Sequence, residues 1–319
     1  MIYADIPSFG KAPLAMYVGL ESADVAVFGV PWDGTGTQRG ARFGPRGIRV
    51  QSQYFYELWN PADPPWISVD QRRARVRQGF KMVDCGDVRV WPGDTMRTSE
   101  SIRKAARLVA SHAFCLMLGG DHYVMYPTYQ GVCDAHAGKR VGIVHVDAHN
   151  DLEDSDPVFG THWSGTPIRR SIEHSKLDPR AVAQIGLRGF TKSTGIDYQV
   201  KNGITVIPMR ELNEIGVQKA ARRAMDAVRG HCDMVYLTVD IDSVDPSCAP
   251  GTGTPTPGGI MGGDFVNLFR ALGTYPEIVA LDLVELAPPL DPTDISSNLA
   301  AHAIFSFLEE HFLLPREDK

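Results

Sequence analysis

Cysteine is scarce in this sequence and forms no motif. The 319 residues include five cysteines, an odd number, and no two of them are spaced as CxxC. A disulfide framework normally uses an even set of cysteines in a short secreted chain. We therefore expect reduced thiols and a cytoplasmic location.

Long apolar runs and an excess of basic residues are also missing. No stretch approaches about 18 uninterrupted apolar residues, the length expected of a membrane span. The chain does not start with a basic segment followed by a long apolar run, so we expect no signal peptide. The net charge is −6, whereas nucleic-acid-binding domains are usually basic. We therefore expect neither a membrane nor a nucleic acid as a partner.

The apolar runs that are present are short and alternate with helical patterns. Most are near-continuous, which is typical of strands buried on both faces of a parallel sheet. The alternation predicts an α/β fold with helices on both sides of the sheet. No linker is evident, so we expect a single domain over residues 1–319. The predicted strands lie within 25–31, 114–120, 141–147, 181–187, 204–208, 234–240 and 278–285, and the predicted helices within 98–112, 211–230 and 262–272.

Acidic residues and histidines follow several of the predicted strands. In open parallel sheets, ligands bind beyond the carboxyl ends of the strands. Side chains that are far apart in the sequence are therefore expected to meet at this edge. They are Asp121, His122, Asp147, His149, Asp151, Asp240, Asp242 and Glu285.

Six of these residues offer nitrogen and oxygen ligands without sulfur. Four carboxylates in one pocket repel one another unless cations neutralise them. The ligand types suit Mn²⁺, with Ni²⁺, Co²⁺ or Zn²⁺ as alternatives, and the oxygens suffice to bridge two ions about 3.5–4 Å apart. A lone aspartate at a strand end is more often a turn or cap residue, so the prediction depends on the combination. The predicted metal ligands are His122, Asp147, His149, Asp151, Asp240 and Asp242.

The segment VHVDAHND supplies three of the six predicted ligands. Alternate residues of an extended or turning segment face the same way, so Asp147, His149 and Asp151 are expected to point together. His145 has the same parity but lies further back in the strand. We interpret His145 as a buried residue that packs behind the ligands.

These motifs resemble those of the ureohydrolase family, which comprises arginases, agmatinases and relatives that hydrolyse guanidino compounds. The similarity covers nearly the whole chain, and the run DPSCAPGTGTPTPGG at 245–259, an expected irregular loop, is more similar to agmatinase-type members than to arginases. The other motifs follow in family order. They are FGVPWDGTGTQRGARFGPRGIR (28–49), LGGDH, VDAHND, QIGLRG (184–189), VDIDSVDP and DLVELAPPLDPTD (282–294).

The resemblance implies a three-layer α/β/α arginase-like fold and a homo-oligomer, commonly a trimer or hexamer. It also implies two divalent metal ions in each chain. Mn²⁺ is the default, and Ni²⁺ is associated with members that cleave free guanidine. One ion would be held by His122, Asp147, Asp151 and Asp240, and the other by Asp147, His149, Asp240 and Asp242, so that Asp147 and Asp240 bridge both.

The expected reaction follows from the charge of the guanidinium group. A hydroxide that bridges two divalent ions stays ionised near neutral pH, so it can attack the guanidino carbon and release urea. Asp151 is the expected carrier of the proton to the leaving amine. Glu285 is expected to accept hydrogen bonds from the guanidino NH groups. The alternative for Glu285 is an exposed acid at a strand end.

The loop THWSGTPIRR at 161–170 departs from the family pattern. Many agmatinase- and arginase-like sequences have a histidine where this chain has Ser164, and a serine cannot hold a proton near pH 7 as imidazole does. One interpretation is that His162, two residues earlier, takes over its catalytic role. In another, the site has a different substrate, since formimidoylglutamase-like members tend to have Ser-Gly-Thr-Pro and hydrolyse a formimino group. In the third, the histidine is dispensable because water carries the proton.

Trp163 is the second departure in this loop. A bulky aromatic side chain beside the site would narrow it, and aromatic faces attract cations. We therefore place a small or alkylated guanidine or a biguanide first among the substrates, with agmatine and guanidinobutyrate as further candidates. Trp163 and Ser164 are predicted to contact the substrate.

Charged residues near the loop allow two interpretations each. Glu153, Asp154 and Asp156 either hold the distal ammonium of a substrate or form a solvated acidic loop. Arg169 and Arg170 either bind a substrate carboxylate or form a salt bridge at a subunit interface, which we favour.

The expected function is therefore hydrolysis of C–N bonds in a linear amidine. The enzymatic alternative is a formimidoyl hydrolase, which releases formamide instead of urea. The non-enzymatic alternative is a partner subunit that supports an active homologue in a hetero-oligomer. The six retained ligand residues argue against that alternative.

Overall fold

A parallel sheet of eight strands organises the chain in this computed structural model, which describes residues 6–35, 40–56, 67–69, 73–74 and 79–313. The strand order is β4-β1-β5-β10-β9-β6-β7-β8. A separate antiparallel pair joins β2 (Ile67–Ser68) and β3 (Arg73–Ala74). The strands of the main sheet are β1 (Val25–Gly29), β4 (Met82–Asp87), β5 (Phe114–Leu118), β6 (Val141–Val146), β7 (Val182–Ile185), β8 (Thr205–Ile207), β9 (Met234–Asp240) and β10 (Ile278–Val284).

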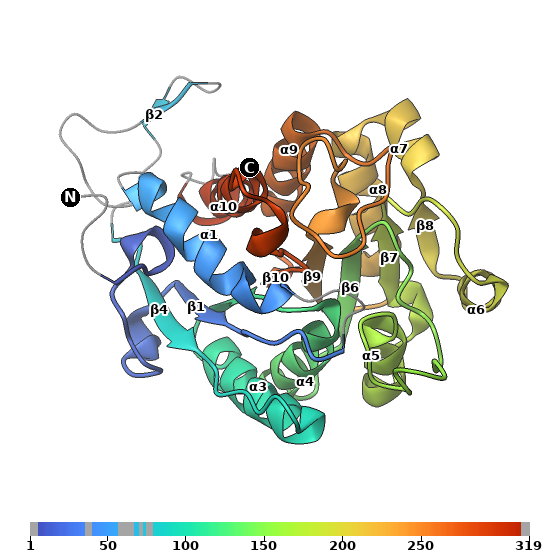
Figure 1. Cartoon of the computed structure of the whole chain (residues 1–319), viewed down its shortest axis with the longest axis horizontal. Helices are drawn as coiled ribbons and strands as arrows, with labels where there is room; N and C mark the ends of the chain where they lie inside the picture. Colours follow the sequence, from blue (N-terminus) through green and yellow to red (C-terminus); the bar gives the residue numbers. More distant parts are fainter. Residues whose placement is uncertain (1–5, 36–39, 57–66, 70–72, 75–78, 314–319) are drawn as a thin grey trace.

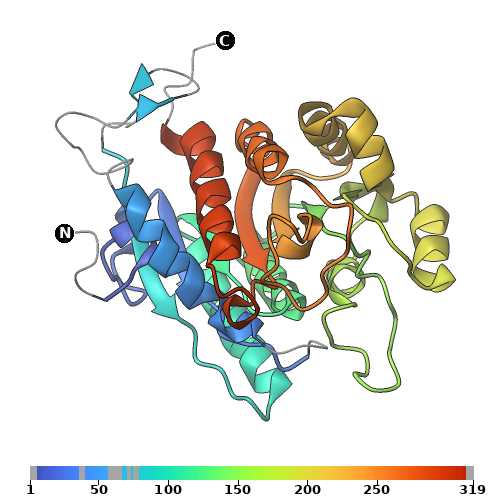
Figure 2. The ribbon, with the colours of Figure 1, turned by 45° about the horizontal axis from the view of Figure 1, so that its top comes forward.

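Helices cover both faces of this sheet (Figure 1). The helices α3, α4 and α5 lie on one face, and α1, α8, α9 and α10 lie on the other, as the turned view also shows (Figure 2). The three-layer α/β/α arrangement confirms the predicted fold class. The helices are α1 (Gly44–Ser52), α3 (Thr95–Ala110), α4 (Met125–Ala135), α5 (Pro167–Ser175), α6 (Ser193–Asn202), α7 (Met209–Ile215), α8 (Val217–Arg229), α9 (Gly262–Gly273) and α10 (Ile295–Leu308).

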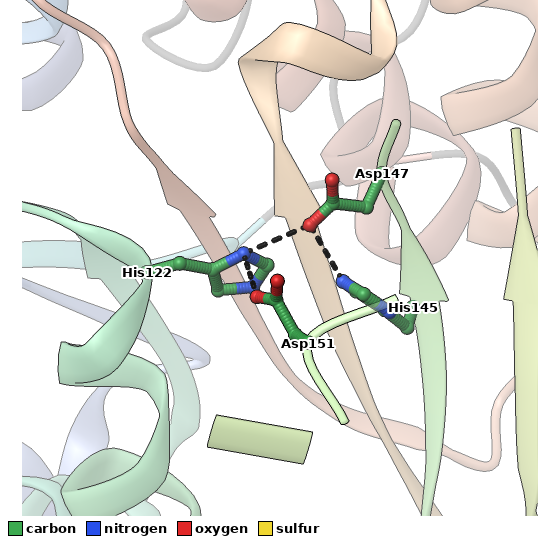
Figure 3. A group of neighbouring side chains, drawn as sticks. All are labelled: His122, His145, Asp147 and Asp151. Atoms are coloured by element: carbon green, nitrogen blue, oxygen red, sulfur yellow. Dashed lines mark hydrogen bonds and ion pairs between the residues drawn. The ribbon is translucent and has the colours of Figure 1, made fainter. Parts of the chain in front are cut away.

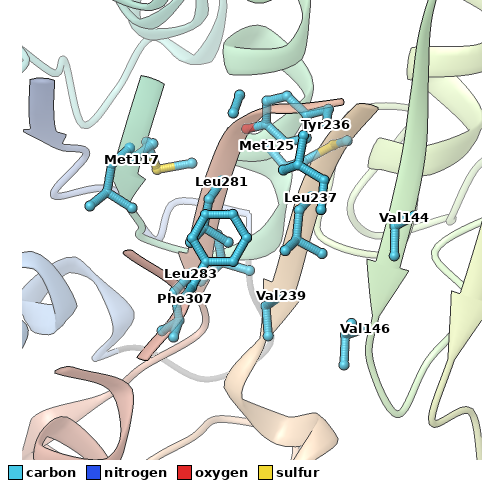
Figure 4. Close-up of a cluster of buried hydrophobic side chains, with 14 of the residues drawn as sticks. Met117, Met125, Val144, Val146, Tyr236, Leu237, Val239, Leu281, Leu283 and Phe307 are labelled. Atoms are coloured by element: carbon cyan, nitrogen blue, oxygen red, sulfur yellow. The ribbon is translucent and has the colours of Figure 1, made fainter. Parts of the chain in front are cut away.

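The central strands are apolar on both faces because helices cover both. Val144 on β6, Leu237 on β9 and Leu281 on β10 are all fully buried, and they lie in the cluster that Figure 4 shows. Burial of each such side chain is worth about 1.5–3 kcal/mol. This packing holds the strand ends, and the residues that follow them, in fixed positions.

Each of the seven apolar runs contains a strand, but the sequence analysis missed β4. Its sequence, MVDCGD, is interrupted by Asp84, which is fully buried. Two nitrogens of Arg49 compensate the Asp84 carboxylate: Nε lies 2.8 Å from Oδ2 and Nη2 lies 3.0 Å from Oδ1. A buried ion pair from α1 therefore replaces the apolar residue that the pattern requires.

The predicted helix over 211–230 is wrong in one respect. Gly216 has a φ of +79° and divides the segment into α7 and α8. The sequence analysis also missed α10, whose interior positions are nearly all buried, so it shows no regular polar stripe.

The segment 245–259 contains neither helix nor strand, as predicted. Among the described residues, no helix combines the length and the apolar character needed to cross a membrane. The single domain stays a prediction.

Candidate metal centre and substrate cavity

The carboxyl ends of four neighbouring strands bring the predicted ligands together. The strands β5, β10, β9 and β6 are adjacent and parallel, so the residues that follow them lie at the same edge of the sheet. His122 follows β5, the segment 147–151 follows β6, and Glu285 follows β10. Asp240 is the last residue of β9, and Asp242 comes two residues later. All six predicted ligands therefore lie in one region.

Three carboxylate oxygens surround one nitrogen of His122. Its Nδ1 lies 3.0 Å from Asp147 Oδ2, 3.0 Å from Asp151 Oδ2 and 3.3 Å from Asp240 Oδ2. Figure 3 shows the first two of these contacts. All four side chains are nearly inaccessible to water, with exposed fractions of 1–7%.

The hydrogen bonds on the other side of the His122 ring fix its proton. Thr238 donates its hydroxyl proton to Asp282 Oδ1 at 2.6 Å, so Thr238 Oγ1 accepts from His122 Nε2 at 3.0 Å. Nε2 therefore bears a proton, and Nδ1 faces the three carboxylate oxygens. Burial alone would lower the pKa of His122, but the carboxylates of Asp151, Asp147 and Asp240 raise it well above its usual range. Within the described residues, Nδ1 has no hydrogen-bond partner although it is buried. A buried nitrogen that faces three carboxylate oxygens needs a positive charge between them, and a proton or a divalent metal ion can supply it, so the residues fit such an ion.

A second group of ligand atoms shares Asp147 with the first. His149 Nδ1 lies 3.0 Å from Asp242 Oδ2 and 3.5 Å from Asp147 Oδ1. Thr254 donates to Asp242 Oδ2 at 2.8 Å, and the Asp242 amide donates to Asp240 Oδ1 at 2.7 Å. The aspartates are buried, whereas 38% of the His149 side chain is exposed. Two adjacent groups with a common carboxylate fit a pair of ions, as the sequence predicts.

The electrostatics of the second group show an excess of negative charge. Burial raises the pKa of Asp240 well above its usual range, and the nearby Asp242 and Asp147 carboxylates raise it further. Burial alone would lower the pKa of His149, but Asp147 and Asp242 raise it to about 12. An Asp240 carboxyl that resists ionisation and a His149 imidazole that holds its proton both indicate that negative charge is in excess here, as a cation site requires.

His145 lies beside the first ligand group, and both of its ring nitrogens have hydrogen-bond partners. Gln184 Nε2 lies 2.8 Å from the Asn150 carbonyl oxygen and 2.8 Å from His145 Nδ1, while Gln184 Oε1 accepts from Gln199 Nε2 at 2.5 Å. Since a carbonyl only accepts, the Gln184 group facing it is the NH₂, which also donates to His145 Nδ1. His145 Nε2 therefore bears the proton and donates to Asp147 Oδ2 at 2.8 Å. This agrees with the interpretation of His145 as a residue behind the ligands.

A cavity of about 300 Å³ opens beside the metal cluster. It contains the predicted substrate residues Trp163, Ser164 and Glu285 in its wall. It also contains residues that the sequence analysis did not assign to the site, among them Asn150 and Thr254, which lie within recognised motifs, and Thr191 and Lys192, which do not. The described lining residues are His122, His149, Asn150, Asp151, Glu153, Trp163, Ser164, Gly165, Thr191, Lys192, Asp240, Thr254 and Glu285.

Glu285 is buried at the end of β10, so it is not the exposed acid of the alternative interpretation. One carboxylate oxygen, Oε1, accepts from the backbone N–H of His122 at 2.8 Å. Burial and the nearby Asp121 carboxylate raise the pKa of Glu285 well above its usual range. Glu285 and Asp151 both have positive φ, at 59° and 51°, a conformation that costs a residue other than glycine about 1–3 kcal/mol. Strained backbone of this kind is concentrated at functional sites.

The structure does not place His162 in the cavity. Its Nδ1 lies 2.8 Å from Thr161 Oγ1, and its ring centre lies 6.0 Å from that of Tyr123 and 6.1 Å from that of Tyr126. Burial and the nearby Arg170 lower the pKa of His162. Its position gives no support to the idea that His162 replaces the absent histidine, and its catalytic role stays a prediction.

Trp163 forms one wall of the cavity, at the position expected to narrow it. Its ring stacks on Phe159, with 5.4 Å between ring centres and an interplanar angle of 24°. The ring also covers Gly165, where an added Cβ would lie 2.5 Å from a ring carbon of Trp163. Glycine at 165 therefore allows the indole to fold against the loop.

Both arginines of the loop have partners within the chain. Arg170 Nη2 lies 2.6 Å from Asp154 Oδ1, and Arg169 Nε lies 3.1 Å from Glu173 Oε1. A salt bridge at a subunit interface stays a prediction. These pairs also occupy Asp154, while Asp156 accepts from the backbone N–H of residue 158 at 2.8 Å as a turn residue. Of the three acids of this segment, Glu153 is the one in the cavity wall.

Comparison with known proteins agrees with this geometry. The pattern that defines the Arginase family matches residues 23–309. The chain is 33% identical to proclavaminate amidinohydrolase of Streptomyces clavuligerus over 97% of this chain and 95% of that protein. The solved structure of that enzyme superposes with a TM-score of 0.85 and 32% identity, covering 98% of both chains.

Two further relatives are named after different guanidino substrates. Guanidinopropionase of Pseudomonas aeruginosa is 34% identical over 96% of this chain and 92% of its own. Agmatinase of Neisseria meningitidis is 35% identical over 92% of this chain and 89% of its own. This chain therefore belongs to the arginase family, on its agmatinase-like branch, and it is a hydrolase that acts on C–N bonds.

Proposed function

We propose that this chain hydrolyses a guanidino compound and releases urea, with two divalent metal ions bound by the six predicted ligands. The observation that supports this most directly is that the buried His122 Nδ1 faces three carboxylate oxygens at 3.0–3.3 Å, in a space that a cation would fill. The cavity beside it contains Glu285, a carboxylate with the right chemistry for a planar cation. Relatives named for guanidino substrates support the substrate class.

Each residue has a task that its position allows. Bound metal ions supply Lewis acidity and activate water for attack. Glu285 orients the guanidinium: its Oε1 is already bonded to the His122 amide, so its Oε2 is the oxygen that accepts from the substrate NH groups. Asp151 has a buried Oδ2 with no hydrogen-bond partner in the described residues, and it transfers the proton to the leaving amine. Trp163 limits the access of water.

Mn²⁺ is the proposed metal and Ni²⁺ the alternative, since the mixed nitrogen and oxygen ligands suit both. The proposed assembly is a homo-oligomer, either a trimer or a hexamer. The alternative is a hetero-oligomer that contains a homologous subunit. Mass measurement of the purified protein in solution tests the assembly. The substrate candidates remain small or alkylated guanidines and biguanides, agmatine and guanidino acids.

The decisive experiment is product analysis on a panel of guanidino compounds, with the purified protein loaded separately with Mn²⁺ and Ni²⁺. Urea from any of them supports the proposal and identifies both the metal and the substrate. Formamide from a formimino substrate, with no urea from the panel, would replace the proposal with the formimidoyl hydrolase. A protein that binds neither metal and yields neither product would support a partner-subunit role.

A further inference from the structure

One part of the cavity wall lies apart from the metal ligands and bears charge of both signs. Lys192 and Glu153 are both in the wall, and Lys192 Nζ lies 3.6 Å from Glu153 Oε2 and 3.7 Å from Asp156 Oδ2. Among the described lining residues, Lys192 is the only lysine or arginine. None of the predicted catalytic steps uses Lys192 or Glu153.

We propose that Lys192 determines which substrate tail the enzyme accepts, by binding the carboxylate of a guanidino acid. The inference rests on the proposed function, because it concerns the far end of the same substrate. Glu153 holds the Lys192 ammonium over the cavity until the substrate arrives.

The present contacts of Lys192 are weak enough to be exchanged. Distances of 3.6 and 3.7 Å exceed those of a hydrogen bond, and 57% of the Lys192 side chain is exposed. Exposed ion pairs of this kind contribute little. A lysine ammonium on its flexible stem can turn to a new acceptor while Glu153, whose side chain is 12% exposed, stays in the wall.

The alternative carboxylate binders in this region already have partners. Arg170 pairs with Asp154 at 2.6 Å and Arg169 with Glu173 at 3.1 Å, and neither arginine is among the described lining residues. Lys192 is therefore the cation that a substrate in the cavity meets.

The charge of a substrate tail decides how it meets the pair of Lys192 and Glu153. A carboxylate can take the place of Glu153 as the acceptor for Lys192. An ammonium tail, as in agmatine, would have to displace Lys192 from Glu153 and would meet its like charge.

The backbone next to Lys192 is held in place by the polar network behind the metal site. Lys192 directly precedes α6, and Gln199 on this helix donates to Gln184 at 2.5 Å. The same helix packs closely on the loop after β6, since a Cβ at Gly195 would lie 2.4 Å from Asn150 Nδ2. The tail subsite and the metal ligands therefore have a fixed relative position.

The test compares Lys192→Met and Lys192→Glu with Lys201→Met, an exposed lysine on α6 outside the described cavity wall. kcat/KM for urea release is measured with 4-guanidinobutyrate and with agmatine. We expect Lys192→Met to lower the value for the guanidino acid about tenfold through KM, because a charged hydrogen bond is lost. kcat/KM for agmatine should stay the same or rise in Lys192→Met. Lys192→Glu should shift the preference further toward agmatine, and Lys201→Met should leave kcat/KM for both substrates unchanged. A ratio between the two substrates that stays within about twofold of wild type would overturn the proposal.

A binding measurement makes the result independent of turnover. Metal-loaded wild type and Lys192→Met are titrated calorimetrically with 4-guanidinobutyrate. Binding that weakens about tenfold in the variant supports the tail subsite even if no urea forms, in which case the proposed reaction fails and the subsite stands. Equal affinity in both proteins, or no binding to wild type, overturns the subsite.

Discussion

The two ends of the cavity are built differently. At the metal end, the ligands lie at the ends of central strands, and all but His149 are buried. His122 donates to Thr238, Thr254 donates to Asp242, and Gln184 orients the His145 behind Asp147. At the tail end, Lys192 and Glu153 come from loops, and their ion pair is long and partly exposed. The reaction depends on positions that the sheet holds rigid, whereas the choice of substrate depends on a rim where a single side chain can change without disturbing the core.

The largest effect is expected at the metal end. Asp240→Ala removes an oxygen that lies 3.3 Å from His122 Nδ1 and is predicted to bridge both ions. Activity should fall roughly a thousandfold or more, because metal ions contribute several kcal/mol to the transition state and about 1.4 kcal/mol is tenfold. Metal content and urea release are measured together, with Asp264→Ala on exposed α9 surface as the control. Full activity at full metal content would remove Asp240 from the site.

Glu285→Gln separates substrate binding from metal binding. Since Glu285 is not a predicted ligand, the variant should keep its metal, yet lose about 10²-fold in kcat/KM because the charged acceptor for the guanidinium is gone. Metal analysis and steady-state kinetics check both parts. Loss of metal from this variant would show that Glu285 is needed to hold the metal ions, which contradicts its assignment to substrate binding alone.

Gln184→Leu tests whether the network behind the ligands matters as much as its burial implies. The change removes the donor to His145 Nδ1, so that the ring is no longer held with its Nε2 proton toward Asp147. Metal affinity, measured by competition with a chelator, should weaken about 10–100-fold. Gln53→Leu, a buried glutamine outside the site, is the matched control for stability. An unchanged affinity would mean that packing alone orients Asp147.

The contrast between the metal end and the tail end of the cavity also explains what the sequence could predict. The apolar strands and the acids at their ends follow simple patterns, so the fold and the convergence of His122, Asp147 and Asp240 were predictable. Lys192 lies beyond the QIGLRG motif in the loop after β7, and its place in the cavity depends on how α6 packs against Asn150. The break at Gly216 depends on one positive φ inside a helical pattern. Such features depend on tertiary packing, which local patterns do not encode.

The smallest effect is expected at His162. The sequence offers it as a replacement for the histidine that Ser164 displaces, but its ring lies against Tyr123 and Tyr126, outside the described cavity wall. His162→Phe keeps these ring contacts and removes the titratable nitrogen, so the pH–rate profile should stay the same and kcat should change less than about threefold, well below the 10²–10⁴-fold contribution of a general acid or base. Loss of the limb of the profile near neutral pH, together with a fall of 10²-fold, would mean that the loop rearranges during turnover and brings His162 to the leaving amine. An unchanged profile would leave water and Asp151 as the proton carriers and make Ser164 compatible with the full reaction.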